Sequence, residues 1–144
     1  GFELHPYFVR TPRSRVTAEC ERIWINDDEV MPLRLDPLPT DRNIKEGLMP
    51  EVGFIDNTFT GWNRKAKIEW PEWNAEMLME SDAPLDFLVM YAPLNEDFFC
   101  VEPVSNVTDA FNMMDRGEAD HGTTVLEAGQ SLKSRITFMP KWTG

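Results

Sequence analysis

Three side chains in this sequence could carry proton-transfer or sugar-binding chemistry: Glu102, His5 and Asp56. Glu102 follows the apolar run Phe98–Val101 and precedes Pro103. Because four successive positions are apolar, we expect a strand that is covered on both faces and that stops at the proline. A carboxylate at the end of such a strand is partly desolvated, which raises its pKa toward the range of a general base at neutral pH. The alternative is a glutamate that points into water.

The other two candidates are framed by apolar residues. His5 precedes Pro6, which keeps its backbone extended, so its imidazole is a candidate acid or base; it could also be simply packed. Asp56 and Asn57 lie in a run that ends with Trp62. A carboxylate and an amide between aromatic rings suit a sugar site, because hydroxyls need acceptors and a pyranose face packs on a ring. An Asx turn with aromatic packing is the simpler interpretation.

The remaining polar residues predict no second site. Cys20 and Cys100 lie far apart and have no metal-ligand spacing, and Cys100 is expected to be a small buried hydrophobe. His121 follows acidic residues in what we expect to be an exposed turn. No serine stands in a nucleophile elbow, and no glycine-rich loop could cradle a phosphate. We therefore expect no metal site.

Composition narrows the classes of partner. The 144 residues include 14 Lys and Arg against 25 Asp and Glu, which gives a formal net charge of -11. That charge disfavours nucleic acids and anionic membranes, and it fits a neutral or cationic small molecule. With no signal peptide and no apolar run long enough to span a bilayer, a cytoplasmic location is expected. The start without Met, in an apolar–polar alternation, suggests a piece of a longer chain.

Short alternating segments separated by turn residues predict an all-β protein, an antiparallel sandwich or barrel of about eight strands. A helix is expected at 109–114, capped by Thr108 or Asp109. The proline-rich stretch 31–50 is expected to be a long surface loop with one helical turn near Ile44. Strands are expected at 2–9, 16–25, 66–70, 76–80, 87–91, 98–102, 122–126 and 131–138.

Four motifs, in this order along the chain, resemble the aldose 1-epimerase (galactose mutarotase) family. They are His5-Pro6-Tyr7-Phe8, Asp56-Asn57-Thr58-Phe59-Thr60-Gly61-Trp62, Cys100-Val101-Glu102-Pro103 with Asp109-Ala110-Phe111-Asn112, and Leu126-Glu127-Ala128-Gly129-Gln130-Ser131-Leu132. Each motif alone is weak, whereas four in the family's order are specific and span nearly the whole chain.

The resemblance implies a galactose mutarotase-like β-sandwich that interconverts the α and β anomers of a free aldose such as glucose or galactose. By this match, Glu102 is the base that takes the C1 hydroxyl proton, and His5 is the acid that protonates the ring oxygen. Asp56 is the carboxylate that holds sugar hydroxyls. No metal or organic cofactor is required. The partner is then a monosaccharide.

This chain departs from the family in length. It has about half the family's residues and resembles the C-terminal half of the domain, so residues 1–144 are either a single domain or that C-terminal part. A further His and an Arg of the family's site have no equivalent here, and Asn106 stands where many relatives carry His. We expect the missing N-terminal half, or another copy of the chain, to cover the exposed sheet edges.

Two other functions remain open from the residues alone. A non-catalytic carbohydrate-binding protein would keep Asp56 and the aromatic residues, but it would not need His5 and Glu102 in register. A glycoside hydrolase could use Asp56 and Glu102 as its two carboxylates, which would leave His5 without a role.

Overall fold

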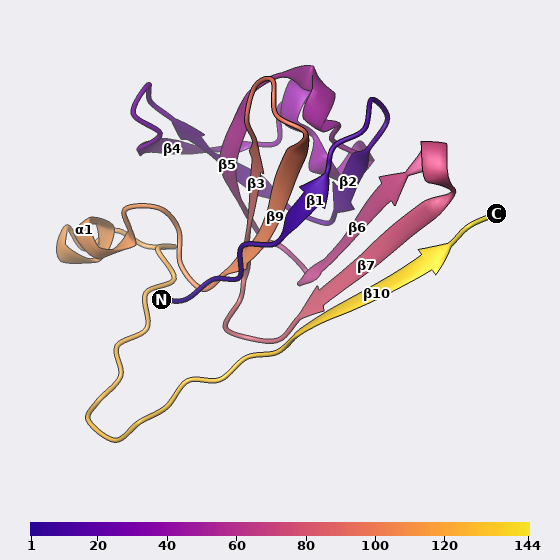
Figure 1. The fold of residues 1–144 in the computed structure, drawn as a ribbon. Helices are drawn as coiled ribbons and strands as arrows, with labels where there is room; N and C mark the ends of the chain where they lie inside the picture. The colour runs from indigo at the N-terminus through magenta and orange to yellow at the C-terminus, as the bar shows by residue number, and fades with distance from the viewer.

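The protein is a sandwich of two antiparallel sheets, described by a computed structural model for all residues 1–144 (Figure 1). This architecture confirms the expected all-β class. Sheet A has six strands in the order β1 (Tyr7–Val9), β9 (Phe98–Val104), β8 (Phe87–Ala92), β5 (Ile55–Thr60), β3 (Arg22–Asn26) and β4 (Pro32–Pro37). Sheet B has four strands in the order β10 (Ile136–Trp142), β7 (Ala75–Ser81), β6 (Lys65–Trp70) and β2 (Arg15–Ala18).

The core between the sheets follows from the alternation of side chains along the strands. Every second residue of a strand points to the same face, so strands such as β5 and β6 present one apolar row inward. Each fully buried aliphatic or phenylalanine side chain contributes roughly 1.5–3 kcal/mol relative to an exposed one. The fully buried residues of this core include Val16, Ile23, Ile55, Phe59, Ile68, Met79, Leu88, Phe99 and Val101.

Strand β9 lies between β1 and β8 and is buried along nearly its whole length, as its apolar run predicts. The prediction that it stops at Pro103 is wrong, because the strand continues to Val104. The carbonyl of Pro103 accepts a hydrogen bond from the Leu4 N–H at 3.2 Å. The proline nitrogen therefore faces the same N-terminal segment, and its missing N–H removes no bond to β8.

The predicted strand at 16–25 is in fact two strands in different sheets. Strand β2 pairs with β6 in sheet B, and β3 pairs with β4 and β5 in sheet A. Residues between them cross from one sheet to the other, with Cys20 buried in the core. Alternation continues through such a crossing, so the pattern alone does not show where the chain leaves one sheet.

The prediction of a loop over residues 31–50 is wrong for its first part. Residues 32–37 form the edge strand β4, which tolerates prolines because its outer side has no partner. The predicted helical turn near Ile44 is confirmed as the 3₁₀ turn η2 (Ile44–Glu46). Three similar turns complete the connections: η1 (Thr40–Arg42), η3 (Pro50–Val52) and η4 (Pro71–Trp73).

After β9 the chain runs out from the sandwich to α1 (Ala110–Asp115) and then returns to β10 (Figure 1). The helix is confirmed, and Asp109, one of the two predicted caps, is its N-cap residue, although its side chain makes no capping bond. The predicted strand at 122–126 does not form. The last strand is shifted toward the C-terminus relative to the prediction, and it runs through Pro140, which lies opposite Met77.

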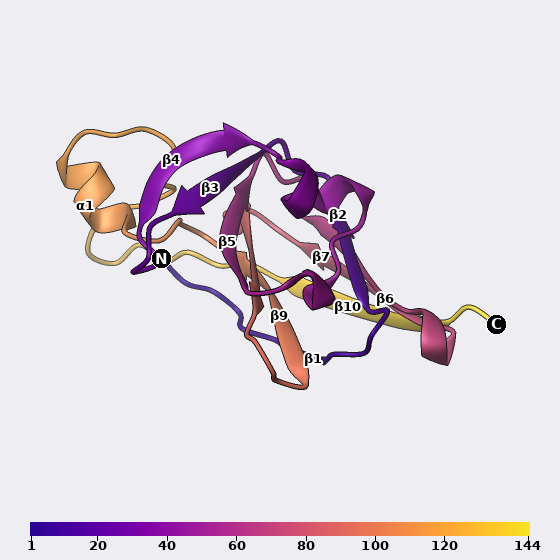
Figure 2. The same ribbon diagram turned by 90° about the horizontal axis from the view of Figure 1, so that it is seen from above.

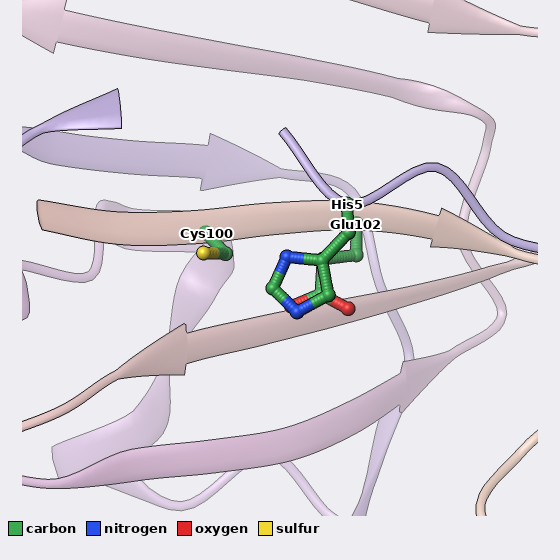
Figure 3. A group of neighbouring side chains, drawn as sticks. All are labelled: His5, Cys100 and Glu102. Atoms are coloured by element: carbon green, nitrogen blue, oxygen red, sulfur yellow. The ribbon is translucent and has the colours of Figure 1, made fainter. Parts of the chain in front are cut away.

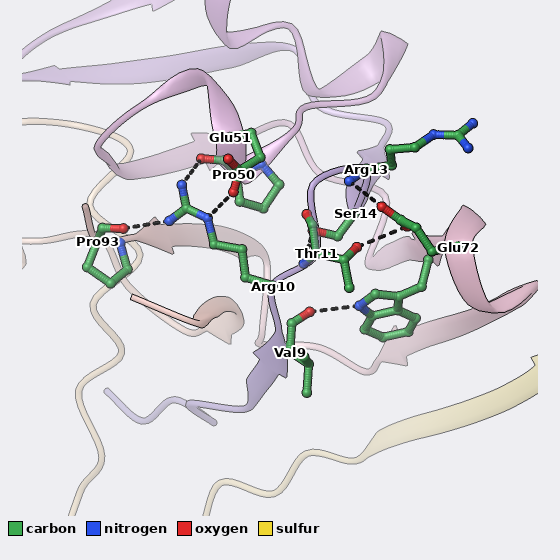
Figure 4. Close-up of polar contacts among 10 residues, drawn as sticks. Val9, Arg10, Thr11, Arg13, Ser14, Pro50, Glu51, Glu72 and Pro93 are labelled. Atoms are coloured by element: carbon green, nitrogen blue, oxygen red, sulfur yellow. Dashed lines mark hydrogen bonds and ion pairs between the residues drawn. The ribbon is translucent and has the colours of Figure 1, made fainter. Parts of the chain in front are cut away.

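Side chains tie the edge strand β1 to sheet B, which fixes the position of the N-terminal segment. The indole N–H of Trp70 donates to the Val9 carbonyl at 2.7 Å (Figure 4). The Glu72 carboxylate accepts bonds from the Thr11 hydroxyl at 3.1 Å and from the Arg13 N–H at 2.7 Å. These contacts join the two sheets at one end of the sandwich.

None of the helices has the length and apolar character needed to cross a membrane.

Candidate functional site

One face of sheet A brings distant parts of the sequence into a single row. Tyr7 pairs with Cys100 and Glu3 bridges to Val104, so His5, midway between, lies opposite Glu102. Directly opposed residues of neighbouring strands share a face of the sheet. The N-terminal histidine and the glutamate of β9 are therefore neighbours, although 97 positions separate them.

The row continues across the sheet through strands β8, β5 and β3. Glu102 pairs with Val89, and Val89 pairs with Thr58. Extending the β3–β5 register by one residue places Trp24 opposite Thr58. A ligand that lies on this face would therefore have an acid–base pair at one end and an indole at the other.

His5 and Glu102 are in direct contact (Figure 3). The Nε2 atom of His5 lies 3.3 Å from Oε1 of Glu102, and the side chains are 40% and 6% exposed, respectively. Tyr7 stacks on the imidazole with ring centroids 5.0 Å apart and an interplanar angle of 19°. The buried carboxylate is thus fixed by its strand, while the half-exposed imidazole is held between a ring and a carboxylate and remains accessible to a ligand.

The surroundings of Glu102 oppose its ionisation. Burial is the main cause, and the negative charges of Glu3 and Asp56 add to it, so the pKa of Glu102 is raised to about 8. A carboxyl group with such a pKa exchanges its proton readily near neutral pH, which is what a general base requires. The expectation of a desolvated carboxylate at this position is confirmed, and the alternative of a solvated glutamate is wrong.

Asp56 lies on the same face but is not in contact with the pair. It stands on β5, one row away, where it pairs with Tyr91 of β8, which in turn pairs with Cys100. Burial raises the pKa of Asp56, and the nearby His5 partly offsets this effect. Asp56 also lines a separate hollow of about 300 Å³ beside Arg42. The simpler interpretation of an Asx turn is wrong, because the residue is inside a strand.

A larger hollow, of about 430 Å³, lies on the same side of sheet A; it is lined by Val89, the strand partner of Glu102, but not by His5 or Glu102 themselves. Its floor includes Glu3, Val89 and Val104, which belong to the same sheet face as Glu102, and its wall is the segment 106–112 that leads into α1. Asn106 and Asn112 supply amide groups there, and Phe111 supplies an aromatic ring. The mixture of a polar wall and an apolar floor suits a small hydroxylated ligand.

Sequence reasoning missed two residues of this face. Cys100, predicted to be a mere hydrophobe, is buried but lies two positions before Glu102, so both side chains point to the same side of β9. Glu3 lies two positions before His5 and acts on the charge of Glu102. Residues two positions apart in an extended segment point to the same face. From this alternation, Glu3 and Cys100 could have been predicted to share the face of His5 and Glu102.

The geometry of the pair limits its chemistry. A carboxylate and an imidazole side by side can move protons in opposite directions on adjacent oxygen atoms of one ligand, without a nucleophile. A glycoside hydrolase needs two carboxyl groups about 5–9.5 Å apart on either side of one bond. Here the group in contact with Glu102 is an imidazole, and Asp56 stands two strands away.

Comparison with known proteins decides the family. The family model described as aldose 1-epimerase matches residues 1–139. This chain belongs to the aldose 1-epimerase family. Among curated proteins it is similar to the uncharacterized protein YphB of Escherichia coli K12, with 27% identity over 99% of this chain and 50% of that protein. The chain thus spans about half the length of this relative.

Solved structures share the fold of this family member. A crystal structure from Escherichia coli K12, provisionally assigned as an aldose 1-epimerase, superposes with a TM-score of 0.84 at 24% identity over 97% of this chain and 50% of that chain. A galactose mutarotase-like protein from Clostridium acetobutylicum gives 0.75 at 16% identity over 97% and 47%. The galactose mutarotase-like sandwich is thereby confirmed. The family match covers nearly the whole chain, but it does not test which half of a relative the chain corresponds to. Assignment to the C-terminal half therefore stays a prediction.

Proposed function

We propose that this chain carries the acid–base pair of a sugar anomerase, an isomerase that interconverts the α and β forms of a free aldose. The observation that carries the proposal is the 3.3 Å contact between His5 Nε2 and Glu102 Oε1, on the same side of sheet A as a ligand-sized hollow. Family membership supports the reaction class, and the neutral monosaccharide substrate agrees with the acidic surroundings of the site.

In this mechanism, Glu102 takes the proton of the C1 hydroxyl while His5 donates a proton to the ring oxygen. The bond between C1 and the ring oxygen breaks, which gives the open-chain aldehyde. Rotation about the C1–C2 bond presents the other face of the carbonyl carbon. On closure, the C5 hydroxyl returns its proton to His5 and Glu102 returns its proton to the C1 oxygen, so both groups regain their starting states. Each group contributes a factor of about 10²–10⁴.

The experiment is polarimetry of freshly dissolved α-D-glucose and α-D-galactose, in a buffer that catalyses anomerisation poorly. We expect the chain to accelerate the change in rotation and Glu102→Gln to reduce that acceleration by about 10²–10⁴-fold. Glu80→Gln is the matched control, because Glu80 stands on strand β7 of sheet B, where it pairs with Lys65. An equal loss in both variants, or none in either, would contradict the role of Glu102.

A non-catalytic carbohydrate-binding function is the second candidate, because the hollow and the aromatic residues would serve binding equally well. It differs in one outcome: sugar binding by the chain with no acceleration of anomerisation. The same assay on the full-length Escherichia coli relative then separates an incomplete site from a binder. An active relative would indicate an incomplete site in this chain, whereas a folded but inactive relative would contradict the anomerase proposal.

We also propose that a polypeptide equivalent to the remaining half of the relatives covers part of this molecule. On β10, Phe138 lies opposite the fully buried Met79, so this side of the strand faces the core. Nevertheless Phe138 is 36% exposed and Trp142 is 77% exposed. Strand β10 lies at the edge of sheet B, and its outer edge has no partner strand (Figures 1 and 2). Exposed apolar residues on an unpaired edge strand are typical of a protein interface.

A further inference from the structure

The acid–base pair has a third polar neighbour, the thiol of Cys100. One ligand atom from each of His5, Cys100 and Glu102 can be chosen so that all three lie within 4.8 Å of one another. Figure 3 shows the imidazole lying over the carboxylate of Glu102, with the sulfur of Cys100 on its other side in this view. Cys100 and Glu102 lie on β9, and His5 lies in the segment between the Glu3–Val104 bridge and β1, so two of the three donors are held by the sheet.

The three donors are nitrogen, sulfur and oxygen, and this set suits a particular class of metal. Magnesium and calcium prefer oxygen ligands alone, whereas Zn²⁺ accepts histidine, cysteine and carboxylate ligands together. Catalytic zinc sites have three protein ligands and one open position. His5 leaves room for such a position, because its side chain is 40% exposed.

We propose that His5, Cys100 and Glu102 form a three-ligand site for a thiophilic divalent cation of the Zn²⁺ type. Ligand atoms around a tetrahedral zinc ion at about 2.0–2.3 Å are roughly 3–4 Å apart, and those of the cluster lie within 4.8 Å of one another, with His5 and Glu102 at 3.3 Å. Small rotations of the side chains therefore suffice. Cys100 forms no disulfide, but burial and the charge of Glu102 raise the pKa of its thiol to about 12, so a bound cation would have to displace the thiol proton. The other free cysteine, Cys20, belongs to no such group of donors.

Occupation of this site would regulate the proposed reaction, a consequence that rests on the proposed function. A cation held by Nε2 or Nδ1 of His5 and by the Glu102 carboxylate removes the acid and the base together. Zn²⁺ would therefore inhibit anomerisation, and a chelator would restore it. Binding of the cation itself does not depend on the chain being an anomerase.

The first test uses Co²⁺ added to the metal-free chain, because thiolate ligation gives cobalt an intense near-ultraviolet charge-transfer band. We expect the band in the unaltered chain, its loss in Cys100→Ser, and its retention in the matched variant Cys20→Ala. Zn²⁺ should displace the cobalt. No band in the unaltered chain, or a band that disappears with Cys20 and not with Cys100, would overturn the proposal.

A second test does not depend on the folding of a core cysteine variant. His5→Asn alters a half-exposed side chain, and removal of one metal ligand should weaken the affinity for Zn²⁺ by at least about tenfold, measured by competition with a chromophoric chelator. His121→Asn serves as the control, because His121 lies outside the cluster. Equal affinities in the unaltered chain and in His5→Asn would overturn the site. If cobalt binds as expected while neither the chain nor the folded full-length Escherichia coli relative accelerates anomerisation, the metal site stands and the proposed function fails.

Discussion

To act as a base, Glu102 must be ionised, but its surroundings in the fold oppose ionisation. Its strand is buried on both faces, and two further carboxylates, Glu3 and Asp56, act on it; His5 is its one cationic neighbour when protonated. A folded-state pKa of about 8, against 4.5 for an ordinary glutamate, means that folding binds a proton between these values. Ionisation of Glu102 therefore destabilises the folded chain.

This linkage predicts how stability changes with pH. Because the folded-state pKa is raised, the contribution of Glu102 is fully present below about pH 4.5 and is lost as the pH rises through about 8. Within this window the free energy of unfolding should fall by about 1.4 kcal/mol per pH unit from this group alone. Glu102→Gln should lose that slope, whereas Glu80→Gln should keep it. Urea unfolding at several pH values measures both, and identical slopes in all three proteins would contradict the prediction.

Asp56 carries a separate prediction about sugar binding. If its carboxylate accepts sugar hydroxyls, Asp56→Asn should weaken the affinity for galactose by about tenfold or more, since hydrogen bonds to a charged group contribute about 1.5–3 kcal/mol. Titration followed by NMR measures this loss without requiring activity. Asp86→Asn, in the exposed connection before β8, is the control and should bind as the unaltered chain does. Unchanged affinity in Asp56→Asn would remove this residue from the site.

The sequence made part of this site predictable. The apolar run before Glu102 indicated a desolvated carboxylate, and Pro6 placed His5 in an extended segment. What could not be predicted from the residues was their contact, because the pairing of β1 with β9 joins segments that are 89 to 93 positions apart in the sequence. The family resemblance supplied that connection. Cys100 was missed because residues 98–101 are all apolar, so the sequence shows no alternation that would distinguish the two faces of this strand.

At the scale of elements, Arg10 holds the end of β1 in place. Its guanidinium donates three hydrogen bonds: to the Glu51 carboxylate at 2.6 Å, to the Pro93 carbonyl at 2.6 Å and to the Pro50 carbonyl at 2.9 Å (Figure 4). The side chain is only 10% exposed. One residue thus links the end of β1, the η3 turn and the connection that follows β8, and thereby supports the strand that directly follows the His5 segment.

Replacement of this arginine should therefore destabilise the fold. Arg10→Met leaves two carbonyls and a carboxylate without their donor, which we expect to lower the free energy of unfolding by about 2–4 kcal/mol. Arg34→Met is the matched control, because Arg34 is 62% exposed and forms only a surface ion pair with Asp36. Its effect should stay within about 0.5 kcal/mol. Urea unfolding midpoints compare the two, and equal losses would show that the buried bonds of Arg10 add nothing.

The elements differ in how well the sequence predicted them. Strands bounded by turn residues, such as β6, β7 and β8, match the predicted ranges closely. The failures share a physical cause. The split between β2 and β3, the pairing of β4 and the shift of β10 are all decided by a neighbouring strand, and alternation along one segment contains no information about its neighbour.

At the scale of the whole molecule, the sandwich is open along β10. A hollow of about 410 Å³ lies there, lined mainly by Trp70, Trp73, Met77, Pro140 and Trp142. Trp70 and Trp73 stack with centroids 6.0 Å apart, so the wall of the hollow is already ordered. Together with a length about half that of the relatives, this surface fits a covering polypeptide from the rest of the family fold.

Reconstitution tests this last point. The half of the Escherichia coli relative that this chain does not match should bind the chain when both are produced together, and Trp142 fluorescence should shift to shorter wavelength as its surroundings become dry. Trp142→Arg should weaken the complex at least about tenfold, because it places a charge against an apolar surface. Lys133→Arg, outside β10 and without a change of charge, is the control. If the chain instead forms a stable dimer of its own that Trp142→Arg disrupts, then a second copy covers β10, and the family's other half is the wrong partner.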